Sequence, residues 1–242
     1  MDQFGGSWGA KDGEKASTLD GISIPALKNT TVANNSKIDI NSTASAVELS
    51  IVSFNIKNIK SNWYYLDELC ENNEIIFLQE TWMSTDKDEI LENKYLEKNK
   101  ILYTRASEKS QFRERGRLSG GIGWLINDKI NHKIEFINER ISTLELKTKN
   151  ELTVIIGAYL PTNSGTKAQD ELKIEIAQIE ALLERHNKSN VLLIGDFNCD
   201  PIRGNRFDQI FSAFMNRNNI ECLEYRYQQT INHTFSGQGK SS

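Results

Sequence analysis

From about residue 47 onward, apolar and polar residues follow two periodic patterns, one typical of strands and one typical of helices. Residues 49–54 are rich in β-branched and aromatic side chains and are apolar on alternate positions, while residues 75–78 are a short, fully apolar run. Both patterns are typical of strands in a covered sheet. Between them, residues 62–73 repeat apolar side chains at intervals of three and four, which is typical of a helix. This order of strand, helix and strand predicts a mixed or parallel sheet with both faces covered.

The same pattern predicts a long series of elements after residue 100. Five strands are expected, near residues 101–105, 121–126, 133–137, 142–147 and 152–160. Residues 167–187 form an expected helix with an apolar stripe on one face. A buried strand at 191–194 and a second helix at 205–218 follow. The chain is therefore predicted to belong to the α/β fold class.

Residues 1–46 differ in pattern from the rest of the chain. They are rich in Gly, Ser, Thr, Asn and Lys and show no sustained period of either kind. Such a segment buries too little apolar surface to offset the entropy that is lost on ordering. We therefore predict a flexible N-terminal tail at 1–46 and one folded domain at 47–242.

Composition narrows the classes of protein that remain. The 242 residues fit one large α/β domain with a tail, and the formal net charge is -4. An overall positive field therefore cannot recruit nucleic acid, so any such binding requires a local basic patch. The three cysteines form no close pair, which gives no indication of a disulfide framework or a thiolate zinc site.

No targeting or membrane-spanning segment is visible in the sequence. Residues 1–17 lack the apolar run of a secretory signal. The longest apolar stretch, at 154–160, is far too short to cross a bilayer. These features predict an intracellular protein of the nucleus or cytoplasm, neither secreted nor bound to a membrane.

Polar side chains with chemical potential stand at the ends of three apolar strands. Asn55 ends the first strand, Glu80 follows the second, and Asp196 and Asn198 follow the strand at 191–194. Strand ends in a covered sheet hold converging side chains on a rigid backbone. Carboxylates are hard oxygen ligands suited to Mg²⁺, and amides hydrogen-bond phosphate oxygens without adding charge. Together these residues predict metal-assisted attack on a phosphodiester.

Each of these segments taken singly has an ordinary structural interpretation. An acidic residue after a strand is more often a helix cap or a turn former. Asn198, followed by Asp200 and Pro201, is also a typical turn sequence. The functional interpretation therefore depends on the combination of the segments and on their order.

The combination resembles the endonuclease/exonuclease/phosphatase superfamily, which includes apurinic endonucleases, deoxyribonuclease I-like enzymes and inositol-polyphosphate phosphatases. The resemblance extends over about residues 47–242. It rests on five segments in family order: Ser53-Phe54-Asn55-Ile56, Leu78-Gln79-Glu80-Thr81, Ser119-Gly120-Gly121-Ile122-Gly123, Ala158-Tyr159-Leu160-Pro161-Thr162-Asn163 and Gly195-Asp196-Phe197-Asn198-Cys199-Asp200-Pro201. The last two are most similar to the endonuclease domains of non-LTR retrotransposons. The implied fold is a two-sheet α/β sandwich flanked by helices, as in deoxyribonuclease I.

The resemblance also implies a role for each matching residue. Glu80 would be the direct metal ligand, with Asn55 assisting beside it. Tyr159 would hydrogen-bond the scissile phosphate. Asp196 would orient or deprotonate the attacking water, and Asn198 would hold the phosphate as charge develops in the transition state. The implied cofactor is Mg²⁺, with Mn²⁺ as the alternative ion.

The sequence departs from the family pattern in one respect. The family closes with a Ser-Asp-His segment, preceded by a strand that carries another aspartate. The printed sequence has no such segment and ends at Ser242. We therefore expect the last strand or strands of the sandwich to be missing and hydrolysis by this chain to be impaired.

Residues 105–117 form a basic segment with two interpretations. Arg113, Arg115 and Arg117 are candidates for gripping the phosphate backbone of a nucleic acid. The alternative is a solvated loop between two strands, which the overall acidity of the chain favours. The glycine-rich segment at 119–123 precedes a strand rather than a helix, so it is expected to serve close packing rather than phosphate binding.

The sequence therefore predicts a Mg²⁺-dependent endonuclease, a hydrolase acting on phosphodiesters of DNA and related to retrotransposon enzymes. Two alternatives stay open. One is a phosphatase or phosphodiesterase on a small phosphorylated substrate, which would not need the basic segment. The other is a retroelement-derived remnant that binds nucleic acid without cleaving it. The sequence predicts neither the oligomeric state nor the target sequence.

Overall fold

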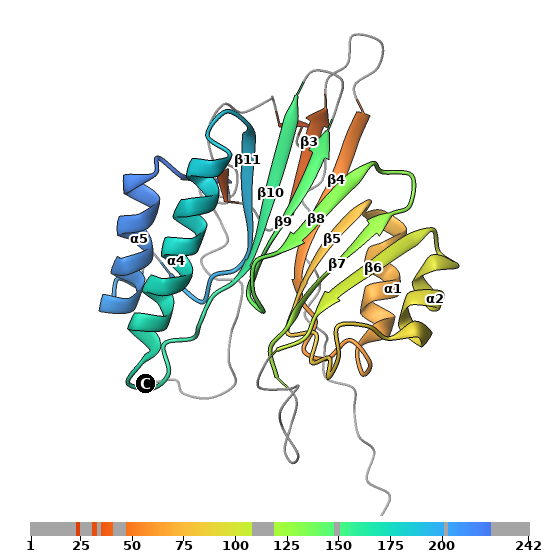
Figure 1. Cartoon of the computed structure of the whole chain (residues 1–242), viewed down its shortest axis with the longest axis horizontal. Coiled ribbons are helices and arrows are strands. Elements are labelled where there is room, and N and C mark those ends of the chain that lie inside the picture. The colour runs from red at the N-terminus through yellow and green to blue at the C-terminus, as the bar shows by residue number, and fades with distance from the viewer. Residues whose placement is uncertain are drawn as a thin grey trace, which may run out of the picture.

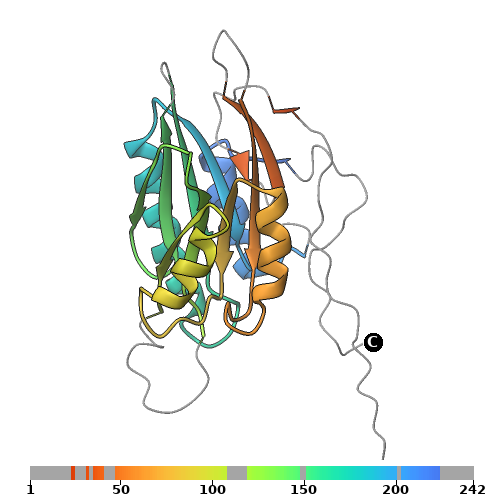
Figure 2. The ribbon, with the colours of Figure 1, turned by 90° about the vertical axis from the view of Figure 1, so that its right-hand side faces the viewer.

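Two sheets packed face to face form the centre of the molecule, with a pair of helices on each outer side (Figure 1). The computed structural model describes residues 23–24, 31–32, 35–40, 47–107, 119–147, 151–200 and 203–223. Figure 2 looks onto the first helix pair, with the second pair on the far side of the strands. The predicted two-sheet α/β sandwich flanked by helices is confirmed.

The described strands divide evenly between the two sheets. The first sheet contains, in spatial order, β1 (Ser23–Ile24), β3 (Asn35–Ile40), β4 (Val47–Asn55), β5 (Ile75–Gln79), β7 (Ile122–Asn127) and β6 (Lys100–Arg105). The second contains β12 (Glu221–Cys222), β2 (Thr31–Val32), β11 (Asn190–Asp196), β10 (Leu152–Tyr159), β9 (Ile141–Lys147) and β8 (His132–Phe136). The helices are α1 (Trp63–Asn72), α2 (Glu89–Leu96), α4 (Ala168–Arg185) and α5 (Arg206–Arg217).

Two parallel strand pairs determine where the candidate residues lie. β4 and β5 are parallel neighbours joined by α1, and Asn55 is in register with Gln79. β10 and β11 are parallel neighbours joined by α4, and Tyr159 is in register with Asp196. Each pair therefore presents two adjacent carboxyl ends, where loops carry the polar side chains.

Three hydrophobic clusters correspond to the three contacts between the four layers. The central cluster lies between the sheets and includes Phe77 and Trp124, whose ring centroids are 4.6 Å apart. The indole nitrogen of Trp124 donates a hydrogen bond of 2.9 Å to the hydroxyl of Ser142 on the other sheet, so this buried polar pair is satisfied. The outer clusters cover the opposite face of each sheet.

The helices bury the stripes that their sequences predict. On α4 the buried side chains recur at intervals of three and four, and α5 buries three phenylalanines against the same sheet. These buried residues are Leu172, Ile176, Ile179 and Leu182 on α4, and Phe207, Phe211 and Phe214 on α5. A capping box formed by Asn205 and Asp208 begins α5 and satisfies two backbone donors.

The structure contains several elements that the sequence pattern did not predict, including the two-residue strand β12. Helix α2 was not predicted, because its eight residues bury only Leu91 and Tyr95 and so show no sustained apolar period. Three strands also lie within residues 1–46, for which the sequence predicts a flexible tail. Of these, β3 pairs with β4 over six residues, and backbone pairing of this kind does not need an apolar repeat. The flexible tail at 1–46 and the boundary at residue 47 stay predictions.

None of the helices in the described ranges is both long enough and apolar enough to cross a membrane.

Candidate active site

Asn55 joins two carboxylates that belong to different sheets. Its side-chain nitrogen donates a hydrogen bond of 2.9 Å to Oδ2 of Asp196 and lies 3.2 Å from Oε1 of Glu80. Asn55 ends β4 in the first sheet, and Asp196 ends β11 in the second. The structure therefore brings these three predicted residues together at one edge of the sandwich.

Tyr159 completes the same cluster from β10. Its hydroxyl donates a hydrogen bond of 3.1 Å to the carboxylate oxygen of Glu80 that Asn55 also contacts. Burial raises the pKa of Tyr159, and the nearby negative charge of Glu80 raises it further. The hydroxyl therefore stays protonated at neutral pH and acts as a hydrogen-bond donor.

The backbone around Glu80 is held in an uncommon conformation. Glu80 has a φ of 54°, in the left-handed region that non-glycine residues rarely occupy. The carbonyl of Glu80 accepts a hydrogen bond from the amide of Asn58, and the amide of Thr81 donates to the carbonyl of Gly121. These contacts fix the conformation that directs Glu80 toward the cluster.

The glycine-rich segment at 119–123 packs against the loop that carries Glu80. A Cβ atom on Gly121 would lie 2.7 Å from the Thr81 hydroxyl oxygen, and the φ of Gly121 is 81°. Only glycine combines this conformation with so close an approach. The packing interpretation of this segment is therefore confirmed.

Asp196 is half-buried, and its surroundings act on its pKa in opposite directions. Burial raises the pKa of the carboxyl, and the charge of Glu80 adds to this effect. Hydrogen bonds from the Asn55 side chain and the Asn198 amide lower it. The net shift is upward, which makes Asp196 a better proton acceptor than an exposed aspartate.

Gly195 allows β11 to lie close to β10 just before Asp196. A Cβ atom at this position would be 1.8 Å from the carbonyl oxygen of Ala158, and the φ of Gly195 is 145°. No other residue fits this site without moving the strands apart.

Asn198 lies beside Asp196, but its side chain points elsewhere. Its side-chain nitrogen Nδ2 donates a hydrogen bond of 2.8 Å to the carbonyl of Leu160. Its backbone N–H donates to Oδ1 of Asp196 at 3.2 Å. Asn198 also has a left-handed φ of 49°. In this structure it connects the ends of β10 and β11 and is linked to the cluster through the backbone.

The donor set fits a divalent cation of the Mg²⁺ type in part. The side-chain oxygen of Asn55 is buried without a hydrogen-bond partner, while the carboxylates of Glu80 and Asp196 lie on either side of the same side chain. Hard oxygen atoms are the ligands such ions prefer. Across the described ranges, no group of three or more His, Cys, Asp or Glu side chains is placed to hold a metal. The described residues therefore supply part of a ligand set.

Arg140 is a neighbour of this cluster that the sequence interpretation missed. Its guanidinium donates a hydrogen bond of 3.3 Å to the carbonyl of Tyr159 and lies 5.3 Å from the centre of the tyrosine ring. The backbone amide of Tyr159 in turn donates to the carbonyl of Arg140 at 2.8 Å. The signal available in the sequence was a basic residue just before the strand predicted at 142–147. The sequence also predicts contacts with the phosphate backbone of a nucleic acid at Arg113, Arg115 and Arg117. These three residues lie outside the described ranges.

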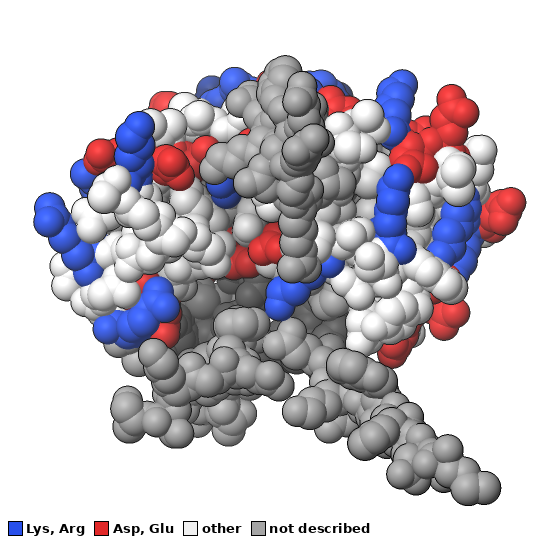
Figure 3. Space-filling view, turned by 90° about the horizontal axis from the view of Figure 1, so that it is seen from below, with Lys and Arg blue, Asp and Glu red and all other residues white. Residues whose placement is uncertain are grey.

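A sequence profile of the Endonuclease/Exonuclease/phosphatase family matches residues 52–233, which include all five residues of the candidate site. The chain belongs to this family. The Endonuclease/Exonuclease/phosphatase family comprises enzymes that hydrolyse phosphate esters, so membership assigns the chain to that general reaction. Figure 3, which views the molecule of Figure 1 from below, shows Lys and Arg side chains interspersed with Asp and Glu side chains on the described part of this face.

Solved structures share the fold of this family member. The 3′ phosphatase NExo from Neisseria, bound to a product DNA hairpin, is 13% identical with a TM-score of 0.54; 69% of this chain and 70% of that chain are covered. The AP endonuclease LMAP from Leishmania major is 12% identical with a TM-score of 0.56, and the match covers 70% of this chain and 66% of that chain. No curated protein sequence matches the chain.

The endonuclease domain of the telomere-specific non-LTR retrotransposon TRAS1 is also similar. It is 8% identical with a TM-score of 0.48, and the coverage is 69% of this chain and 70% of that chain. A likeness at this level does not separate one branch of the family from another, so the retrotransposon relationship stays a prediction.

Proposed function

We propose that this chain is a Mg²⁺-dependent endonuclease-type phosphodiesterase that acts on DNA. The observation that carries the proposal is the hydrogen-bonded cluster in which Asn55 joins Glu80 and Asp196 and Tyr159 joins Glu80. Carboxylates, a carboxamide and a phenol at one edge of a rigid sandwich are the groups that phosphodiester hydrolysis requires.

Asp196 is proposed as the general base. It accepts a proton from water while the water oxygen bonds to phosphorus and the bond from phosphorus to the leaving oxygen breaks. Its raised pKa strengthens it as a proton acceptor, and the hydrogen bond from Asn55 orients the carboxylate. General-base catalysis of this kind contributes about 10² to 10⁴ in rate.

Tyr159 and Asn198 are proposed to hold the phosphate. The Tyr159 hydroxyl is protonated, so it can donate a hydrogen bond to a non-bridging phosphate oxygen once it leaves the Glu80 carboxylate. The side-chain nitrogen of Asn198 would donate a second hydrogen bond to the phosphate once it leaves the carbonyl of Leu160. Donors directed at oxygens that gain charge stabilise the transition state most.

Glu80 and Asn55 are proposed as the metal ligands. A Mg²⁺ ion bound there would supply a Lewis acid that polarises the phosphate. Mn²⁺ uses the same oxygen ligands and is the alternative ion. Before the ion binds, the Glu80 carboxylate is held in place by hydrogen bonds from Asn55 and Tyr159.

DNA is the proposed substrate class, and two considerations support it. The structural relatives named above include a phosphatase bound to a DNA hairpin and an AP endonuclease. The sequence also contains Arg113, Arg115 and Arg117, which would provide a row of phosphate contacts. A small phosphorylated substrate does not need such a row.

A plasmid-nicking assay tests the proposal. The chain, in excess over supercoiled plasmid so that slow cleavage is detected, is compared with Asp196→Ala in Mg²⁺ and in EDTA. We expect conversion to the open circle by the unaltered chain in Mg²⁺ alone. Hydrolysis of inositol phosphates or nitrophenyl phosphate with no nicking would instead favour the small-substrate alternative. Nicking that persists in Asp196→Ala would reject the assigned base.

A further inference from the structure

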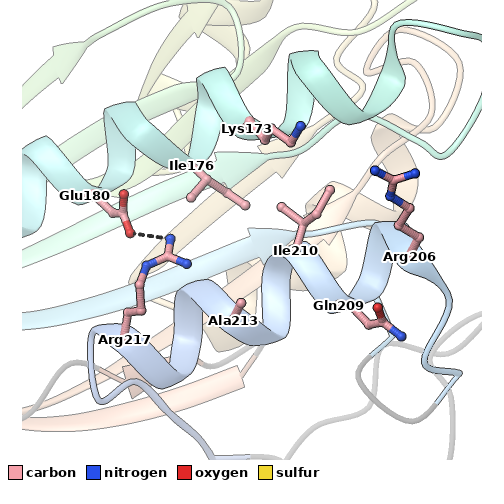
Figure 4. A pocket seen from close by; sticks show the side chains of 8 residues that line it. All are labelled: Lys173, Ile176, Glu180, Arg206, Gln209, Ile210, Ala213 and Arg217. Atoms are coloured by element: carbon pink, nitrogen blue, oxygen red, sulfur yellow. Dashed lines mark hydrogen bonds and ion pairs between the residues drawn. The ribbon is translucent and has the colours of Figure 1, made fainter.

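A groove runs between α4 and α5 on the outer side of the helical layer, separate from the candidate active site. It encloses about 400 Å³. Side chains from both helices point into it from its two walls (Figure 4). The residues that line it are Lys173, Ile176, Glu180, Arg206, Gln209, Ile210, Ala213 and Arg217.

The middle of the groove is aliphatic. Ile176 is 3% exposed and forms part of the core behind the groove, and Ile210 packs against the same core while staying partly exposed. Ala213 adds a small exposed side chain that leaves room above it. This strip of the surface is therefore suited to apolar side chains of a partner.

The charged groups of the groove are distributed unevenly. Arg217 pairs with Glu180 at 2.8 Å, so this end is electrically balanced. At the other end, Lys173 is 3.4 Å from Asp170, but both side chains are more than half exposed, at 57% and 77%, so the pair is weak. Arg206 makes no ion pair with any described residue.

The positive end of the groove lies at the N-terminal ends of both helices. Arg206 is the first residue of α5, and Lys173 lies in the second turn of α4. Acidic residues in the first turns, Asp170 and Glu171 on α4 and Asp208 on α5, offset the partial positive charge of the helix ends, so the positive charge of the groove comes from the two side chains. The whole chain carries a formal net charge of -4, so this groove has the opposite sign to the protein as a whole. Charge complementarity therefore favours an acidic partner.

We propose that the α4–α5 groove binds an acidic amphipathic peptide segment of a partner protein. Its apolar side chains would lie on Ile176, Ile210 and Ala213, and its carboxylates would meet Lys173 and Arg206. A nucleic acid fits less well, because no aromatic side chain lines the groove for bases to stack on. No lining residue belongs to the Asn55 cluster, so the proposal does not depend on the nuclease assignment.

The length of the groove sets the size of the partner segment. From Arg206 to Arg217, α5 rises about 16 Å at the usual 1.5 Å per residue. A helical segment of about twelve residues would cover it, with apolar anchors at intervals of three and four.

A designed peptide provides the test. The probe is a labelled helix of about twelve residues with Leu on one face and Glu at one end. Its binding is followed by fluorescence anisotropy, together with the NMR methyl signals of Ile176 and Ile210. We expect saturable binding that shifts these methyl signals. The double variant Lys173→Glu/Arg206→Glu should weaken binding by at least about tenfold.

Matched controls separate the groove from general charge effects. Lys129→Glu/Lys188→Glu makes the same change in net charge at exposed lysines that do not line the groove, and should bind the peptide normally. Ala213→Trp fills the groove without changing its charge and should also abolish the methyl shifts. Equal loss in both double variants, binding that leaves the two isoleucines unshifted, or displacement of the peptide by a DNA oligonucleotide at the groove would overturn the proposal.

Discussion

Asn55 and Asp196 are separated by 141 positions in sequence, yet the amide nitrogen of one lies 2.9 Å from a carboxylate oxygen of the other. This hydrogen bond joins the ends of strands from opposite sheets of the sandwich. The geometry of the candidate site therefore depends on how the sheets are packed, and not only on the loops that carry its residues.

The pH dependence of hydrolysis should reveal the Asn55–Asp196 hydrogen bond. As a general base, Asp196 must be deprotonated, so activity falls when pH drops through its raised pKa. Asn55 lowers the pKa of Asp196, so Asn55→Ala should move the acidic limb of the kcat/KM profile to higher pH. The control is Asn187→Ala, an exposed position on the turn after α4. An acidic limb that stays at the same pH would show that Asn55 does not affect the pKa of Asp196.

Metal binding should depend on Glu80. We expect Glu80→Gln to weaken Mg²⁺ binding strongly in calorimetry, since a neutral amide replaces the charged ligand while keeping its shape. Glu68→Gln, an exposed change on α1, is the matched control. Equal affinities for the unaltered chain and Glu80→Gln would remove Glu80 from the ligand set.

The half-buried Asp196 and the buried Asp208 should respond in opposite ways to the same substitution. Burial raises the folded-state pKa of Asp196, so its charged form destabilises the fold and the free energy of unfolding falls as pH rises through that pKa. Arg203 lowers the folded-state pKa of Asp208, so its contribution is present at neutral pH and is lost as pH falls.

At pH 7, Asp196→Asn should therefore raise the free energy of unfolding. Asp208→Asn should lower it by about 1 to 3 kcal/mol, the usual cost of leaving buried polar groups unpaired, because Arg203 is half exposed and solvent screens its charge. Urea denaturation of both variants measures the two changes. A loss of stability in Asp196→Asn would show that its hydrogen bonds outweigh the cost of burying its charge.

Replacing Gly157 by any larger residue should destabilise the fold as long as Phe77 packs against it. A Cβ atom on Gly157 would lie 2.6 Å from the Phe77 ring across the interface between the sheets. We expect Gly157→Ala to cost about 1 to 3 kcal/mol of unfolding free energy, the usual effect of overpacking a core. In a Phe77→Leu background the added cost should largely vanish, and additive costs would locate the strain elsewhere.

The basic segment makes a prediction about salt. If Arg113, Arg115 and Arg117 contact DNA, replacing all three by Gln should flatten the plot of log affinity against log salt by about 0.9 for each lost phosphate contact. Filter binding or anisotropy with a short duplex measures this slope. An unchanged slope would favour the solvated-loop interpretation.

The regular spacing of apolar residues was sufficient to predict most strands and both long helices, whereas the two-sheet sandwich was predicted from the resemblance to the family. The helix at 167–187 and the strand at 191–194 have counterparts in α4 and β11, since both bury continuous apolar surface. Helix α2 escaped prediction because it buries two side chains only. β3 escaped because its order comes from backbone pairing with β4.

The same limit applies to the candidate site. Asn55, Glu80, Tyr159 and Asp196 were predicted as a set, and the structure places them in one hydrogen-bonded cluster. The contact of Arg140 with Tyr159 could not be predicted, because it depends on the register between β9 and β10. The direction of the Asn198 side chain toward Leu160 likewise depends on a local backbone conformation that residue types do not reveal.

The left-handed backbone at Glu80 has a consequence for how such a sequence changes over generations. A non-glycine residue in that region costs about 1 to 2 kcal/mol, and glycine relieves the cost. Replacing Glu80 by glycine would therefore ease the backbone while removing the carboxylate. In a lineage that no longer needs hydrolysis, selection for stability and loss of function would act in the same direction here. We expect decaying copies of this sequence to lose Glu80 early and to keep the buried strands around it.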